Sequence, residues 1–343
     1  MNRSTGDGAG MFSDDRKRTE LIDPHGRRVN YLRLSVTDRC NLRCSYCMPA
    51  EGARQRRPGA MLGFEELYRI ATVATELGIE KIRITGGEPL VRRGIVDFLA
   101  RLSSLPRLKE LVLTTNGTLL PAMADELRDA GVARLNISLD SLEPETFARI
   151  TRQGRLDDVL AGIEAAGYSG LPVKINTVIM RGVNDGEIPD FIRMTLDQAL
   201  SVRFIEYMPV IKAPDWQSLV LTGQQILARI TCSHQVEELA AERRCGPARM
   251  FRVKGARGSF GLITPLSGHF CAQCNRIRIS AAGHASSCLF SDRRIDVRAA
   301  LQGDGNAPLV AVIRELIGAK PARHHVSTAQ APHLPFAMSQ IGG

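Results

Sequence analysis

Short hydrophobic segments alternate with amphipathic helical segments from about residue 31 to residue 207. In Phe64–Leu77 and Pro121–Ala130, apolar residues recur at intervals of three and four, which predicts helices with one buried face. Gly131 follows the second segment and is a candidate helix-ending glycine. Alternation of this kind predicts parallel strands joined by helical crossovers. The six predicted strands are Tyr31–Val36, Lys81–Thr85, Glu110–Thr115, Arg134–Leu139, Pro172–Ile179 and Val202–Tyr207.

Polar side chains occupy alternate positions in several of these strands. Lys81 and Arg83 lie two residues apart, and Asn136, Ser138 and Asp140 repeat that spacing. Side chains at such positions share one face of a strand. A doubly wound sheet, covered by helices on both faces, would have apolar strands throughout. The pattern therefore predicts an α/β fold of another kind, an incomplete (β/α)6 TIM-type barrel with apolar residues outward and polar residues facing its lumen.

The regular alternation ends near residue 210. Beyond it, Thr222–Thr231 predicts a helix, and Met250–Val253 with Phe260–Thr264 predicts a pair of strands. We therefore divide the chain into a flexible N-terminal extension (1–19), a barrel (20–210) and a C-terminal α+β segment (211–343) that closes the barrel mouth. The extension is rich in Gly, Ser and charged residues and has no apolar stretch like that of a signal peptide.

Charge and hydropathy narrow the classes of function. No apolar run approaches the roughly 18 residues that a membrane span needs, so we expect no membrane partner and a cytoplasmic location. The net charge is +9, but no helix-turn-helix, RNA-binding or zinc-finger pattern predicts a nucleic-acid partner. Because cations recur on one face of the predicted strands, we expect a small polyanion inside the fold.

The strongest motif is a cysteine triplet directly after the first predicted strand. Cys40, Cys44 and Cys47 have the spacing C-x3-C-x2-C. Three thiolates leave one iron of a [4Fe–4S] cluster without a protein ligand, which is what a substrate-binding cluster requires. A zinc site would need a fourth ligand, and the nearest histidine is His25.

A second triplet lies in the C-terminal segment. Cys271 and Cys274 form a C-x2-C pair, and Cys288 follows after thirteen intervening residues. From spacing alone, this group suits zinc as well as iron, with His269 and His284 as nearby candidates for a fourth ligand. The remaining cysteines, Cys232 and Cys245, stand alone.

A glycine pair follows the second predicted strand. In Gly86-Gly87-Glu88-Pro89, the glycines permit a positive φ angle and close approach of the backbone to a ligand. The motif lies at the carboxyl end of a strand, where the active sites of barrels are found.

Taken together, these motifs resemble the radical S-adenosylmethionine superfamily and, within it, the GTP 3′,8-cyclase (MoaA) family. The resemblance runs from about residue 20 to residue 343. It rests on the first triplet with Tyr46, the GGEP turn, the second triplet and the terminal Gly-Gly. Further matching segments are Leu32–Cys40, Lys81–Pro89, Leu113–Gly117, Asn136–Asp140, Arg203–Glu206, Phe260–Thr264, Cys271–Arg278 and Cys288–Phe290.

The resemblance implies a lyase of molybdenum cofactor biosynthesis that converts GTP to (8S)-3′,8-cyclo-7,8-dihydro-GTP by radical chemistry. It also implies two [4Fe–4S] clusters, one of which binds S-adenosyl-L-methionine and the other the guanine end of GTP. Expected partners are GTP, a low-potential electron donor of the flavodoxin or ferredoxin type, and a downstream MoaC-like cyclic pyranopterin monophosphate synthase. A homodimer is compatible with the sequence.

Site residues follow from the resemblance position by position. The first cluster's ligands are Cys40, Cys44 and Cys47, and the second cluster's are Cys271, Cys274 and Cys288. Contacts to S-adenosylmethionine are implied for Tyr46, Gly87, Thr114, Ser138 and Met208. Contacts to GTP are implied for Arg33, Lys81, Arg83, Lys174, Arg203, Arg276 and Arg278. The resemblance also implies a catalytic role for Arg33. It implies catalytic roles for Gly342 and Gly343, because the C-terminal tail enters the active site in this family.

Two other interpretations remain open from the sequence. A peptide-modifying radical S-adenosylmethionine enzyme with an auxiliary cluster would share the first triplet and the GGEP turn without needing the cations. A non-catalytic zinc-binding protein would hold zinc rather than iron.

Overall fold

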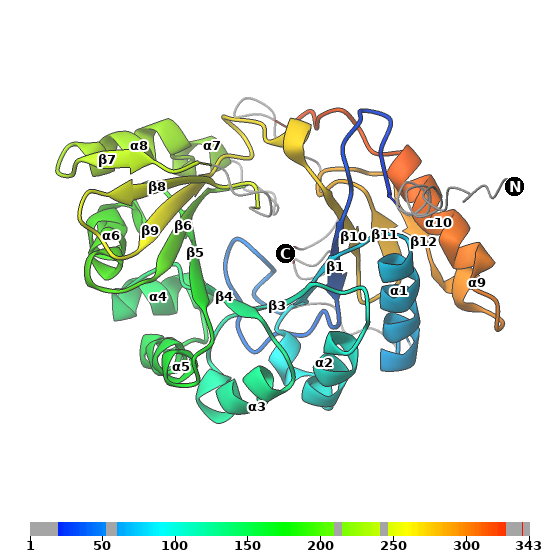
Figure 1. Cartoon of the computed structure of the whole chain (residues 1–343). Coiled ribbons are helices and arrows are strands. Elements are labelled where there is room, and N and C mark those ends of the chain that lie inside the picture. The colour runs from blue at the N-terminus through cyan, green and yellow to red at the C-terminus, as the bar shows by residue number, and fades with distance from the viewer. Residues whose placement is uncertain (1–19, 53–59, 209–214, 241–245, 327–337, 339–343) are drawn as a thin grey trace, which may run out of the picture.

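One curved, twelve-stranded sheet organises the computed structural model, which describes residues 20–52, 60–208, 215–240, 246–326 and 338. The strand order is β12-β11-β10-β1-β2-β3-β4-β5-β6-β9-β8-β7. Figure 1 shows the strands arranged around a central space with helices on the outside. The sheet does not close on itself, so the predicted incomplete barrel is present.

The six predicted strands form the centre of this sheet as a continuous parallel run. Each begins and ends within one residue of its predicted bounds. Consecutive strands pair in parallel, as expected for strands joined by helical crossovers. Their bounds are β1 (Tyr31–Ser35), β2 (Lys81–Thr85), β3 (Glu110–Thr115), β4 (Arg134–Ser138), β5 (Val173–Ile179) and β6 (Ser201–Glu206).

The crossover helices cover the convex side of the run (Figure 1). The carboxylate of Glu66 accepts a hydrogen bond from the backbone N–H of Gly63 at 2.6 Å, which caps the first helix. The predicted helix at 121–130 begins instead as a 3₁₀ turn, although Gly131 ends it with φ of +81° as expected. The helices are α1 (Phe64–Glu76), α2 (Ile95–Ser103), α3 (Ala124–Asp129), α4 (Pro144–Thr151), α5 (Leu156–Tyr168) and α6 (Ile188–Asp197).

Strands from the C-terminal segment extend the parallel run at both edges. The strand β9 (Ser259–Ile263) pairs in parallel with β6, and β10 (Arg276–Ile279) pairs in parallel with β1. The predicted pairing of β9 with its neighbour β8 is confirmed. The sequence did not predict that this segment would lengthen the barrel wall. Its other elements are α7 (Trp216–Leu219), α8 (Gly223–Thr231), β7 (Val236–Glu238), β8 (Arg249–Val253), β11 (His284–Ser286), β12 (Ile295–Asp296), α9 (Arg298–Leu301) and α10 (Ala307–Gly318).

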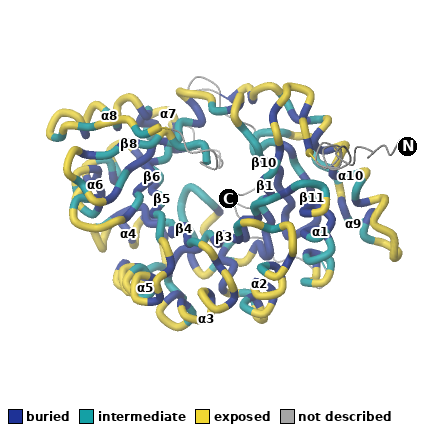
Figure 2. Tube along the Cα trace, in the orientation of Figure 1, coloured by how far each residue is buried: buried dark blue, intermediate teal, exposed yellow. Residues whose placement is uncertain are grey.

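The hydrophobic core lies between the sheet and its outer helices. Leu32 and Leu34 of β1, and Ile82 and Ile84 of β2, have no exposed surface, and Figure 2 shows the strands buried inside the ring of helices. The alternate positions turn toward the lumen, as predicted from the two-residue period. Within the part of the chain that the structure describes, no helix is long and apolar enough to cross a bilayer.

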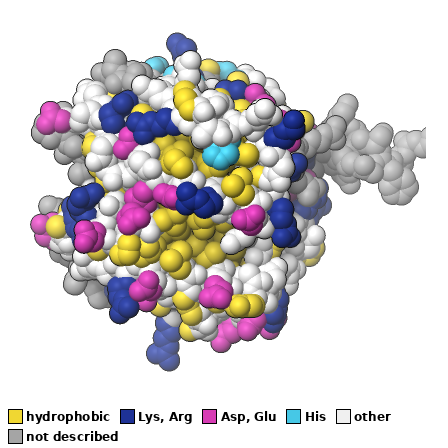
Figure 3. All heavy atoms as spheres, turned by 90° about the vertical axis from the view of Figure 1, so that its left-hand side faces the viewer, with side chains coloured by type: hydrophobic (Ala, Val, Ile, Leu, Met, Phe, Trp, Pro, Cys, Tyr) yellow, Lys and Arg dark blue, Asp and Glu magenta, His cyan; other side chains and the backbone are white. Residues whose placement is uncertain are grey.

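The face made by α6, α8 and their neighbours carries charges of both signs. In Figure 3, lysine and arginine side chains on this face are interspersed with aspartate and glutamate side chains around apolar ones. The positive net charge of the chain is therefore not gathered on this face.

Candidate active site

A cavity of about 500 Å³ opens into the lumen of the barrel, a volume typical of small-molecule sites. It brings together residues from the barrel strands and from the C-terminal segment. Cys40 and Cys44 are not among its lining residues, and Gly342 and Gly343 fall outside the described residues. The predicted site residues that line the cavity are Arg33, Tyr46, Cys47, Lys81, Arg83, Gly87, Thr114, Ser138, Lys174, Arg203, Met208, Cys271, Cys274, Arg276, Arg278 and Cys288.

The loop of the first triplet is held in shape by two arginines. Arg43 donates to the carbonyl oxygens of Cys40 and Leu42. Arg152, just beyond α4, donates to the carbonyls of Arg43 and Met48 at 3.1 Å each. Arg152 is also the one non-glycine residue with positive φ among those the structure describes. These hydrogen bonds support the backbone of the cysteine loop.

The three thiols of this loop lie close enough to influence one another. Burial raises the pKa of Cys44 well above its usual value, and the neighbouring Asp140, Cys47 and Cys40 raise it further. A coordinated metal would reverse this preference, because a thiol that binds a metal ion loses its proton. Three crowded thiols thus fit the ligand set of an iron–sulfur cluster with one open iron.

The GGEP turn packs directly against the start of that loop. A β-carbon on Gly87 would lie 2.3 Å from the carbonyl oxygen of Arg39, and one on Gly86 would lie 2.6 Å from that of Thr37. Neither glycine has a positive φ, so the structure does not use the backbone freedom that glycine permits here. The glycines are needed because two backbone segments cross without room for a side chain. Both glycines also line the cavity.

Glu88 of the same motif links this turn to the end of β3. Its carboxylate is 1% exposed and accepts from the N–H of Asn116 at 2.6 Å, from the N–H of Leu90 at 3.0 Å and from Thr115 Oγ1 at 2.9 Å. Burial raises the pKa of Glu88 to about 7, although these donors act in the opposite direction. Asn116 in turn donates to Asn41 in the cysteine loop at 2.8 Å. The acidic side chain thus organises the backbone around the first triplet.

Tyr46 is oriented in the cavity by a buried aspartate at the end of β4. Its hydroxyl donates to Asp140 Oδ2 at 2.7 Å, while Asp140 Oδ1 accepts from the N–H of Val178 at 2.8 Å. Burial raises the pKa of Asp140 to about 6, and the two hydrogen bonds counteract it. Asp140 was predicted to face the lumen but was not assigned this contact.

Three arginines lie side by side across neighbouring strands. Arg33 is in register with Arg83 on one side and with Arg278 on the other. Burial, and then the charges of Arg278 and Arg83, hold the pKa of Arg33 well below its usual range. Buried donors on all three side chains, namely Nε of Arg33 and Arg83 and Nη1 of Arg278, have no hydrogen-bond partner in the described part of the chain. Repelling cations with unused buried donors are suited to binding an anion.

A second row begins at Tyr31, two residues before Arg33. Tyr31 is in register with Arg276 and Lys81. Its burial acts to raise the pKa of the phenol, but the surrounding Arg83, Arg33, Lys81 and Arg276 lower it to about 8. The two-residue period could have identified Tyr31 as a lumen residue, although the sequence analysis did not single it out.

One acidic side chain interrupts the cations of this row. The carboxylate of Glu110 lies 2.7 Å from the ammonium of Lys81 and 2.7 Å from the guanidinium of Arg134. Glu110 and Arg134 both line the cavity. Lys81 therefore has an ion-pair partner within the protein. Nothing in the sequence distinguished Glu110 or Arg134 from ordinary strand ends.

Cations also line the cavity from the strands on the other side of the barrel. Arg203 of β6 is 5% exposed, and Lys174 lies on the neighbouring β5. Both line the same cavity as Arg33. The arrangement thus presents positive charge from β1, β2, β5, β6 and β10 to one enclosed volume.

The second triplet faces the cavity from the C-terminal segment. Burial acts to raise the pKa of Cys274, but the charges of Arg276 and Lys320 lower it to about 6. Burial raises the pKa of Cys288. The positive surroundings of Cys274 favour its thiolate, the form that binds iron or zinc.

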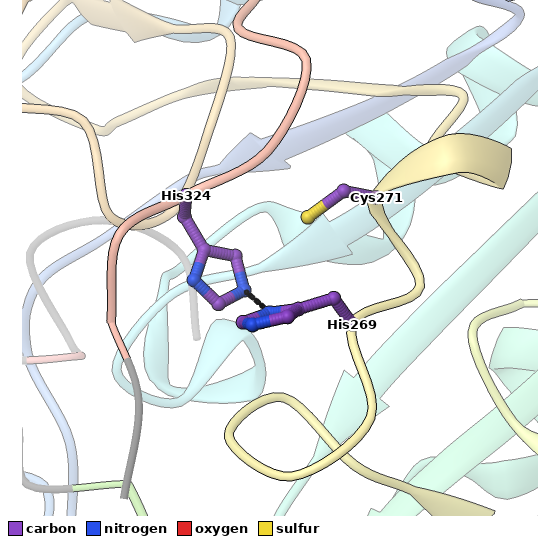
Figure 4. Close-up of side chains that lie close together, drawn as sticks. All are labelled: His269, Cys271 and His324. Atoms are coloured by element: carbon purple, nitrogen blue, oxygen red, sulfur yellow. Dashed lines mark hydrogen bonds between the residues drawn. The ribbon is translucent and has the colours of Figure 1, made fainter. Parts of the chain in front are cut away.

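Two histidines accompany Cys271 (Figure 4). His269 Nδ1 lies 3.3 Å from His324 Nε2, and the ligand atoms of these two side chains and Cys271 all lie within 4.8 Å of one another. His284, the other histidine considered as a fourth ligand, lies on β11 and does not belong to this group. Geometry by itself thus keeps zinc possible at the second triplet.

Comparison with known proteins distinguishes iron from zinc at the second triplet. Residues 34–195 match the family model of the Radical SAM superfamily, and residues 200–326 match Molybdenum Cofactor Synthesis C. GTP 3′,8-cyclase of Geobacter sulfurreducens is 57% identical over 94% of this chain and 100% of its own length. GTP 3′,8-cyclase of Syntrophomonas wolfei is 44% identical over 94% of this chain and 100% of its own length.

Solved structures support the fold. Streptococcus suis SuiB bound to S-adenosylmethionine superposes with a TM-score of 0.59, at 16% identity, over 84% of this chain and 69% of that one. Native anSMEcpe with bound AdoMet gives a TM-score of 0.51 at 14% identity, over 82% of this chain and 83% of that one. At these identities the likeness concerns the fold alone, whereas the sequence relatives decide the family. The chain belongs to the GTP 3′,8-cyclase family of the radical S-adenosylmethionine superfamily.

Proposed function

We propose that this enzyme cyclises GTP to (8S)-3′,8-cyclo-7,8-dihydro-GTP in molybdenum cofactor biosynthesis. It uses S-adenosylmethionine and [4Fe–4S] clusters, as its family does. The observation that carries the proposal is the placement of cysteines from both triplets and all seven predicted cations on one cavity of about 500 Å³. A peptide-modifying enzyme would not need that many cations in its lumen.

We assign the first cluster to Cys40, Cys44 and Cys47. S-adenosylmethionine would lie near Tyr46, Gly87, Thr114, Ser138 and Met208, four of which come from the ends of barrel strands or the residues just after them. When bound, the cluster and S-adenosylmethionine supply the radical chemistry of the reaction. The protein orients Tyr46 through Asp140 and supports the cysteine loop through Glu88 and Asn116.

We assign the second cluster to Cys271, Cys274 and Cys288, and the triphosphate of GTP to the cations. A triphosphate carries about four negative charges near neutral pH, and each charge-assisted hydrogen bond contributes about 1.5–3 kcal/mol. Arg33 is central because it lies between Arg83 and Arg278. The remaining cations in this assignment are Lys81, Lys174, Arg203 and Arg276.

One anaerobic experiment tests the function. The reconstituted protein should contain iron and sulfide for two clusters and form 5′-deoxyadenosine with S-adenosylmethionine and a strong reductant. Mass spectrometry should detect the cyclised nucleotide when GTP is present. Iron for a single cluster, or 5′-deoxyadenosine formation that is indifferent to GTP, would contradict the proposal.

The partners and the location follow from the same chemistry. A low-potential flavodoxin or ferredoxin would supply the electron, and a MoaC-like cyclic pyranopterin monophosphate synthase would consume the product. We place the reaction in the cytoplasm, because cysteine metal ligands require reducing surroundings. We also place the boundary between the barrel and the C-terminal segment near residue 210, which is supported by the family matches at 34–195 and 200–326.

The terminal glycines give a separate prediction. We expect deletion of Gly342 and Gly343 to leave iron and sulfide content unchanged but to reduce cyclised product by at least about 10²-fold, the size of effect seen when a group that positions the reactants is lost. Iron analysis and product quantification of the same preparation check it. Unchanged turnover of the shortened chain would exclude a catalytic role for the tail.

A further inference from the structure

A buried lysine just beyond α10 contacts the second cysteine triplet. Lys320 is 4% exposed. Its ammonium donates to Cys274 Sγ at 3.3 Å, to the carbonyl oxygen of Arg276 at 2.9 Å and to that of Ser287 at 2.8 Å. A lysine ammonium has three hydrogens. Each therefore has an acceptor, and all three acceptors belong to the segments that carry the cysteines.

These contacts join two separate parts of the triplet. Arg276 lies two residues after Cys274, and Ser287 directly precedes Cys288. One side chain thus ties the backbone beside Cys288 to that beside Cys274. Lys320 follows the end of α10 by two residues. Because α10 packs against α1 and α9, the segment that bears Lys320 is attached to a well-packed part of the fold.

Among the described residues, the ammonium of Lys320 has no carboxylate partner, which distinguishes it from the neighbouring Arg27. Arg27 donates to the carbonyl oxygens of Cys271 and Pro321 at 2.7 Å each, and it is paired with the buried carboxylate of Asp23. In the described part of the chain, no ion pair to an acidic side chain is recorded for Lys320. Burying an unpaired ammonium is costly, so the thiolate of Cys274 is its natural counter-charge.

We propose that Lys320 is a positioning residue of the second cluster, holding Cys274 and Cys288 in place and raising the reduction potential of the cluster through its positive charge. The inference depends on the assignment of Cys271, Cys274 and Cys288 as cluster ligands. A cation beside a ligand sulfur stabilises the reduced form, which carries one more negative charge. Partners that orient metal ligands commonly change metal affinity by about 10–100-fold when they are removed.

The test uses the full chain with Cys40, Cys44 and Cys47 replaced by alanine, so that only the second cluster forms. In this background, Lys320→Met should shift the midpoint potential, followed by electron paramagnetic resonance, to a more negative value. It should also accelerate loss of iron to a chelator by about 10–100-fold. Lys254→Met, at an exposed lysine between β8 and β9, is the matched control and should change neither quantity.

The possible outcomes distinguish failure of the cluster assignment from failure of the role proposed for Lys320. A background variant without iron would contradict the cluster assignment itself, and with it the proposed site. Iron in the background variant, together with an unchanged potential in Lys320→Met, would overturn the role of Lys320 alone. Should Lys320→Met fail to fold, Lys320→Gln decides, because its amide can still donate to the two carbonyls while the charge is absent. A purely structural lysine predicts no change of potential in the glutamine variant.

Discussion

Replacing Cys44 by serine should abolish the formation of 5′-deoxyadenosine. Cys44 is the assigned middle ligand of the first triplet, and Arg43 and Arg152 support the backbone of its loop. A hydroxyl at this position cannot replace a thiolate, because soft sulfur ligands are what iron–sulfur clusters require. Chemical analysis should show iron and sulfide for one cluster instead of two, and chromatography should show no 5′-deoxyadenosine.

Cys232 provides the matched control for this loss. It is an exposed cysteine at the end of α8, and its replacement by serine should leave both iron content and activity unchanged. Retention of S-adenosylmethionine cleavage by Cys44→Ser would contradict the assignment of the first triplet. Loss of activity in a variant that still contains both clusters would show that Cys44 is needed for a reason other than binding iron.

Replacing Arg33 by methionine should change substrate binding and folding stability in opposite directions. Truncating one partner of a buried charged contact costs about 2–5 kcal/mol, so the dissociation constant for GTP should rise by at least about 30-fold. The unliganded protein should become more stable, because Arg33 is partly buried between Arg83 and Arg278 and all three repel one another. Anaerobic titration calorimetry measures the first effect, and denaturant unfolding of the apo protein measures the second.

Arg28 is the matched control for Arg33. It lies five residues earlier in the chain, is 45% exposed and pairs with Glu20 and Glu80 at the surface. Arg28→Met should change the affinity for GTP little, since exposed ion pairs contribute about 0–1 kcal/mol. If Arg33→Met weakened both binding and folding, the side chain would be a packing residue rather than a substrate contact.

The hydrophobic pattern was sufficient to predict the barrel strands almost to the residue. The strands from β1 to β6 have an apolar outward face and place many polar side chains inward, and both follow the two-residue period of the chain. The same period placed Lys81, Arg83 and Ser138 on the lumen. It could not predict that β9 and β10 extend the sheet, because pairing between strands far apart in sequence depends on how the whole chain closes.

The cysteine spacing and the family motifs identified the candidate site, but they did not reveal what supports it. Glu88 bonds to Asn116, and Tyr46 bonds to Asp140, only because strand ends far apart in the sequence meet at one edge of the sheet. The sequence offered two reasons for Gly86 and Gly87, a positive φ angle and close approach of the backbone to a ligand. Their neighbours show that they are needed for space instead.

The sequence by itself determined the alternation of strands and helices, the polar lumen and the two cysteine triplets, because these depend on residue type and local spacing. The tertiary structure decided which charges became neighbours. Arg33 acquires Arg83 and Arg278 through strand register, and Lys320 reaches Cys274 from 46 residues away in the chain. Electrostatic interactions depend on distance in space and on burial, and no local pattern in a sequence encodes either of them.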